Sequence, residues 1–102
     1  MATTVTLHNV SASHGGACDC DDWHVQGPAS TIKQPTLHPG QTARIDLSQL
    51  GWDQYEGQEF ELAAICEGYS IKRHSSKVVY KLDQNYQFDW EGPSGNPKIV
   101  GP

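Results

Sequence analysis

Hydrophobic and polar residues alternate in five segments of the chain, and this period of two predicts β-strands. In 58–66, for example, Phe60, Leu62, Ala64 and Cys66 fall on one face. The five segments are 3–10, 42–47, 58–66, 77–82 and 86–90. Shorter strands are expected at 23–25, 31–33 or 68–73, and the turn-forming residues 83–85 predict a tight hairpin loop.

These strands predict an all-β fold, because no segment of useful length carries an amphipathic helical stripe. Short strands with one hydrophobic face are stable when two such faces pack together. We therefore expect a single-domain antiparallel β-sandwich of about six to eight short strands over residues 1–102, with a small β-barrel as the alternative. Ten glycines and six prolines fit the many turns of such a fold.

Two stretches fall outside the alternating pattern. Residues 11–41 are rich in Ser, Gly, Asp and Pro, and they predict a long irregular loop. Residues 92–102 predict a Pro/Gly-rich C-terminal tail that does not supply a central strand.

The composition argues against several classes of partner and location. The formal net charge is −5, so the chain lacks the basic footprint of a nucleic-acid-binding protein. The N-terminus shows no signal peptide, which predicts a cytoplasmic protein as the sequence stands, or a secreted one if a leader was removed. No apolar segment approaches ~20 residues, the length that a membrane-spanning helix needs.

The segment 14–24 holds the densest set of chemically active side chains. Thiolates and imidazoles are the ligands that zinc and copper prefer, so the segment predicts a single transition-metal ion, Zn or Cu. The candidate ligands are His14, Cys18, Cys20 and His24. The Cys-x-Cys spacing is narrower than that of standard structural zinc sites. The alternative is that the protein has no cofactor. Calcium, bound by Asp19, Asp21 and Asp22, is a weaker candidate because no closing Glu follows.

The three cysteines leave two further interpretations open. Cys18 or Cys20 could form a disulfide with Cys66, leaving one thiol over, whereas a Cys18–Cys20 bond would be strained. Alternatively, Cys66 is a buried core thiol, because it lies in phase with Phe60 and Leu62. A cysteine nucleophile would need an orienting third group that the sequence does not supply, so we expect no enzyme.

Aromatic residues outside the predicted strands suggest a binding function. Trp23, Trp52 and Tyr55 fall in predicted loops, and Asp53 and Gln54 lie beside them. Aromatic faces beside hydrogen-bonding side chains suit a saccharide. We therefore expect a non-enzymatic module that recognises a carbohydrate or another polar surface ligand through these five residues. The structural alternative is that Trp52 closes the open end of the sandwich and is buried.

Other classes of function are carried as alternatives. One is the metal-binding protein described above. Another is a membrane-active or protein-interaction domain that uses the basic residues between Lys72 and Lys81, although the overall negative charge disfavours membrane binding. Sandwiches often pair through exposed edge strands, so a homo-oligomer is a further alternative.

Overall fold

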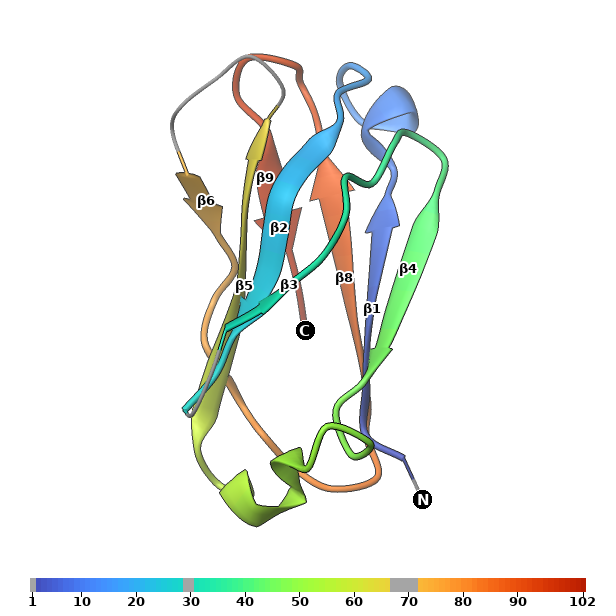
Figure 1. The fold of residues 1–102 in the computed structure, drawn as a ribbon. Helices are drawn as coiled ribbons and strands as arrows, with labels where there is room; N and C mark the ends of the chain where they lie inside the picture. Colours follow the sequence, from blue (N-terminus) through green and yellow to red (C-terminus); the bar gives the residue numbers. More distant parts are fainter. Residues whose placement is uncertain (1, 29–30, 67–71) are drawn as a thin grey trace.

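A computed structural model of the chain describes residues 2–28, 31–66 and 72–102, which form a β-sandwich (Figure 1). Its nine described strands lie in two sheets. The first sheet has the order β4 (Thr42–Asp46), β1 (Thr4–Asn9), β8 (Asn85–Glu91) and β9 (Lys98–Val100). The second has the order β3 (Thr31–Lys33), β2 (Cys20–Gln26), β5 (Glu59–Cys66) and β6 (Lys72–His74), and β7 (Val78–Val79) also pairs with β5.

The sheets are antiparallel except for one pair, because β1 runs parallel to β8. Two single turns of 3-10 helix, η1 (Ser11–Ser13) and η2 (Trp52–Tyr55), lie at opposite ends of the sandwich (Figure 1). The radius of gyration, 13.1 Å, matches that of a single domain of ~100 residues. The fold class predicted from the sequence is therefore confirmed.

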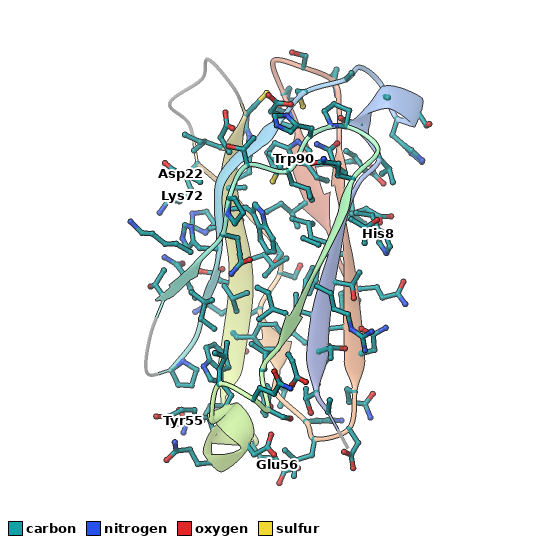
Figure 2. The ribbon with its side chains drawn as sticks, turned by 45° about the vertical axis from the view of Figure 1, so that its right-hand side comes forward. His8, Asp22, Tyr55, Glu56, Lys72 and Trp90 are labelled. Atoms are coloured by element: carbon teal, nitrogen blue, oxygen red, sulfur yellow. The ribbon has the colours of Figure 1, made fainter. Side chains whose placement is uncertain are left out.

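One hydrophobic core fills the space between the sheets, and it comes from the alternation seen in the sequence. Val5 and Leu7 of β1 are fully buried, as are Leu62 and Ala64 of β5. Tyr86, Phe88 and Trp90 of β8 face the same core, and Trp90 lies between the sheets in Figure 2. Cys66 is 1% exposed and belongs to this core, which confirms its interpretation as a buried core thiol.

Two local predictions are wrong, and a third holds in part. Residues 11–41 are not one irregular loop, because they contain β2 and β3, which include the short strands expected at 23–25 and 31–33. The tail 92–102 contains β9, which was not expected, but β9 lies at the edge of the first sheet, so the tail supplies no central strand, as predicted. Residues 83–85 do not close a hairpin, since β7 pairs with β5 whereas β8 pairs with β1 and β9.

The strand predicted at 77–82 is shorter in the structure. Only Val78–Val79 pairs with β5, after which the chain crosses from one sheet to the other. The strand expected at 68–73 lies mostly outside the described residues, within which β6 begins at Lys72. No helix in the described part of the chain is long and apolar enough to span a membrane.

Candidate functional site

The η2 segment, where the sequence predicted ligand-binding aromatics, is packed against the core. Gly51 enters the segment in a left-handed conformation, and the turn places Trp52 inward at 3% exposure. The Trp52 ring lies 6.1 Å from Tyr80 and 6.4 Å from Phe60, measured between ring centroids. Trp52 therefore closes this end of the sandwich, as the structural alternative predicted.

The polar neighbours of Trp52 also make structural contacts. The Asp53 carboxylate accepts hydrogen bonds from Ser48 Oγ at 2.8 Å and from the Tyr80 hydroxyl at 3.0 Å. Gln54 Nε2 donates to the carbonyl of Gly51 at 3.1 Å. Tyr55 is half-buried with its ring edge against Trp52, at the lower end in Figure 2. The fifth predicted binding residue, Trp23, lies apart from this group in β2.

The structure does not bring the four predicted metal ligands together. His14 is exposed, and its Nδ1 lies 3.8 Å from Glu91. Cys18 and Cys20 lie in the core, whereas His24 faces the outside of the second sheet, where its Nδ1 hydrogen-bonds to the carbonyl of Asp22 at 2.7 Å. Among the described residues, no group of three His, Cys, Asp or Glu side chains is arranged to hold a metal ion.

A β-bulge in β2 explains this separation. The register with β5 shifts between Asp21 and His24, and Asp22 takes a left-handed backbone conformation with φ of 49°. The extra residue allows Cys20, Trp23 and Val25 all to face the core, although simple alternation would turn Trp23 outward. His24 is then left on the opposite face of the strand from Cys20.

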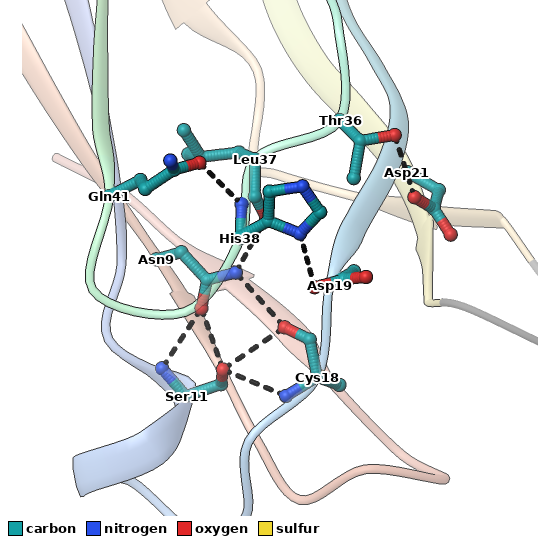
Figure 3. A network of polar contacts seen from close by, with 9 residues as sticks. All are labelled: Asn9, Ser11, Cys18, Asp19, Asp21, Thr36, Leu37, His38 and Gln41. Atoms are coloured by element: carbon teal, nitrogen blue, oxygen red, sulfur yellow. Dashed lines mark hydrogen bonds and ion pairs between the residues drawn. The ribbon is translucent and has the colours of Figure 1, made fainter.

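The acidic residues of the same segment bind separate neighbours. Asp19 Oδ1 lies 2.9 Å from Nδ1 of His38, and Asp21 Oδ1 accepts a hydrogen bond from Thr36 at 2.9 Å (Figure 3). Asp22 is exposed on the bulge. The three side chains therefore do not form the oxygen cage expected for calcium.

Below these acids, a buried network holds the entrance to β2 (Figure 3). Asn9 is 1% exposed, and its Nδ2 donates to the carbonyls of Cys18 at 2.9 Å and Leu37 at 2.8 Å. The Ser11 hydroxyl donates to Asn9 Oδ1 at 2.6 Å and accepts from the Cys18 N–H at 3.0 Å. The network therefore satisfies buried backbone groups and fixes the position of Cys18.

The three cysteines lie together at this end of the core as free thiols. Cys20 and Cys66 are directly opposite in the β2–β5 pair, and Cys18 lies close enough to Cys66 to raise the pKa of its thiol. Burial, followed by the contact with Cys18, raises the pKa of Cys66 from 9.0 to about 11. Burial also raises the pKa of Cys20 far above its ordinary range, with a further contribution from Asp21.

A hollow of about 330 Å³ lies where the sheet edges face each other, between β4 and the segment that follows β3. Its lining is uncharged and combines one indole with amides, hydroxyls and apolar groups. We call it the Trp23 hollow, and its lining residues are Trp23, Gln34, Pro35, Thr36, Leu37, Gln41, Thr42 and Ala43. The buried Trp23 Nε1 has no hydrogen-bond partner among the described residues. Sequence reasoning named only Trp23 of this set, because the other seven give no motif.

Two further hollows differ in chemistry. One of about 290 Å³ is lined in part by His8, His14 and Gln41, and another of about 240 Å³ by Asp22, His24 and the lysines 33 and 72. The lining of the Trp23 hollow is the most suitable of the three for a neutral polar ligand.

Comparison with known proteins supports the fold and leaves the function open. No protein-family model matches the chain, and no curated protein matches it. Among solved structures, the chain is similar to a protein from Eubacterium rectale whose structure was determined by NMR. The TM-score is 0.64 and the sequence identity 9%, over 99% of this chain and 88% of that chain. At this identity the likeness concerns the fold alone.

Proposed function

We propose that this protein is a non-enzymatic binding module for a carbohydrate, and that the ligand binds in the Trp23 hollow. The supporting observation is the uncharged lining of the hollow, which places amides and hydroxyls around an indole. The hydroxyl groups of a sugar can hydrogen-bond to the amides and hydroxyls of the lining, and the apolar face of its ring can pack against the indole. The volume of about 330 Å³ lies at the lower end of the range for small-molecule sites.

The position of the hollow at a sheet edge adds to this argument. Among the described strands, β4 pairs with β1 alone, so its other edge carries backbone N–H and C=O groups that no described strand uses. Trp23 supplies a buried N–H that lacks an acceptor within the described residues.

The proposal differs from the site expected from the sequence. Trp52, Asp53 and Tyr55 pack against one another or against the core, so their faces and oxygens are already in use. Trp23 is retained, and Gln34, Thr36 and Gln41 replace them as the hydrogen-bonding groups. Each of these three side chains makes one hydrogen bond within the described part of the protein, and the side-chain carbonyl of Gln34, the Thr36 lone pairs and the Gln41 amino group remain for a ligand. This set favours a ligand without charge.

A titration of ¹⁵N-labelled protein with a panel of neutral mono- and disaccharides tests the proposal. We expect the indole N–H signal of Trp23 to shift with ligand. The signal of Trp90, whose buried N–H also lacks a partner but which does not line the hollow, is the internal reference. If no saccharide in the panel shifts any signal of the lining residues, the proposal is wrong.

A matched pair of glutamine variants locates the site. Gln34→Ala removes a lining amide, and we expect affinity about five-fold lower, the loss of roughly one net hydrogen bond. Gln54→Ala removes an amide at η2 and should leave affinity unchanged. Weakened binding by Gln54→Ala with no effect of Gln34→Ala would place the site at η2 instead.

A further inference from the structure

The three thiols at the end of the core come from two adjacent strands. The backbone N–H and C=O of Cys20 both pair with Leu37, at 2.9 and 3.0 Å. The opposite side of Cys20, toward Cys66, is therefore a non-hydrogen-bonded pair, in which the side chains of an antiparallel ladder come closest. Cys18 lies two residues before Cys20, belongs to the same buried cluster and contributes to the raised pKa of Cys66, which places its thiol near that of Cys66.

Cys18 differs from the other two in its position outside the strands and in its access to solvent. It precedes β2 and is 7% exposed, whereas Cys66 is 1% and Cys20 0% exposed. Asn9 and Ser11 hold its backbone, so its thiol stays against Cys66 without pairing in the strand ladder. The Ser94 side chain favours the thiolate form of Cys66 and partly offsets the effect of burial on its pKa.

We propose that Cys18 and Cys66 form a reversible disulfide by exchange with a small-molecule disulfide, which makes this pair a redox modification site. The Cys18 thiolate attacks one sulfur of the reagent R–S–S–R, forms a Cys18–S–S–R bond and releases RS⁻. The Cys66 thiolate then attacks the Cys18 sulfur and releases the second RS⁻. The two cysteine protons end on the two RS⁻ groups, so two thiols are oxidised while the reagent is reduced to two RSH.

The cross-link would join two segments that are distant in sequence. It would connect the entrance of β2 to the end of β5, which are otherwise held by the Asn9 network and by strand pairing. A disulfide that closes a long loop raises stability by restricting the unfolded chain. We therefore expect oxidation to raise Tm by about 10 °C, and reduction to reverse the change.

The test maps the bond in the native wild-type protein. The protein is incubated with oxidised glutathione, remaining thiols are alkylated, and the product is digested with a protease that cleaves before Asp. Cleavage before Asp19 separates Cys18 from Cys20, so mass spectrometry distinguishes the two possible partners of Cys66. We expect a Cys18–Cys66 peptide that has lost two hydrogen atoms, together with an alkylated Cys20.

Two variants provide matched controls. Cys20→Ala should still form the cross-link, whereas Cys18→Ala should form none and show no oxidant-dependent rise in Tm. Wild-type protein that yields a Cys20–Cys66 bond, glutathione adducts without an internal bond, or three alkylated cysteines would overturn the proposal. Because the wild-type map is decisive by itself, a variant that fails to fold does not affect the test.

Discussion

The η2 end of the sandwich is closed by aromatic rings, whereas the cysteine end, where Cys18, Cys20 and Cys66 meet, is closed by hydrogen bonds and thiols. At the first, Trp52 packs against Phe60 and Tyr80. At the second, Asn9 and its partners hold the chain. Both ends are rich in side chains that are often functional. The comparison shows that such residues identify a site only when some of their donor, acceptor or reactive atoms are left unused by the fold.

The difference between the ends predicts the largest effect for the aromatic end. Trp52→Ala removes a buried ring that contacts three others, and we expect it to lower the free energy of unfolding by about 3–5 kcal/mol. Urea unfolding measures the change. The control is Leu50→Ala, because Leu50 is 53% exposed in the same region and should change stability by less than ~0.5 kcal/mol.

At the cysteine end, we expect the loss of buried hydrogen bonds, rather than the loss of packed side-chain volume, to lower the free energy of unfolding. Asn9→Ala leaves the carbonyls of Cys18 and Leu37 without their side-chain donor, and we expect a loss of about 3 kcal/mol. Asn85→Ala is the control in the same sheet. Asn85 is exposed, and its Oδ1 accepts from the hydroxyls of Thr4 at 2.7 Å and Thr6 at 3.2 Å, so its loss should be smaller, about 1 kcal/mol. Equal losses in urea unfolding would show that the Asn9 network is not a special feature of this end.

Close packing around Trp52 gives a third prediction. A Cβ at Gly27 would lie 1.8 Å from the Trp52 ring, so Gly27→Ala must displace a buried side chain. We expect thermal unfolding to show a loss of about 2 kcal/mol. Gly51→Ala meets no atom within 4 Å and only introduces strain at positive φ, so it should cost about 1 kcal/mol. A larger effect at Gly51 would contradict the packing of Trp52.

The thiols give the cysteine end a pH dependence. The pKa of Cys66 is raised from 9.0 to about 11, so above pH 9 the unfolded chain loses its proton while the folded chain retains it. Stability contributed by the neutral thiol is therefore present below pH 9 and is lost as pH rises toward 11, with a slope of up to ~1.4 kcal/mol per pH unit. Urea unfolding between pH 8 and 11 under reducing conditions measures the slope, and Cys66→Ala should reduce it.

Alternation predicted most of the scaffold because most strands bury one face. Val5 and Leu7, or Phe60 and Leu62, are separated by single polar or half-buried positions, and their strands form where expected. The same phase placed Cys66 in the core. β2 was harder to predict because the bulge at Asp22 breaks its period. The residues 83–85 have turn chemistry that does not reveal which sheets the turn connects.

The candidate sites were less predictable than the scaffold. A short turn such as η2 shows no hydrophobic period, so the sequence does not distinguish an exposed ligand-binding Trp from one that is buried against the core. Strand pairing between segments distant in sequence brings Cys18 near Cys66 and also forms the Trp23 hollow, so the sequence alone did not reveal either site. Membrane binding and self-association stay predictions.

Tryptophan fluorescence tests most directly the central claim, that Trp23 and Trp52, which were expected in loops, are interior groups like the strand residue Trp90. Trp23, Trp52 and Trp90 are 1%, 3% and 0% exposed. The account therefore predicts native emission well to the blue of the urea-unfolded protein and weak quenching by iodide. Native emission at the unfolded wavelength, or quenching of a third or more of the signal with the efficiency of free tryptophan, would contradict it.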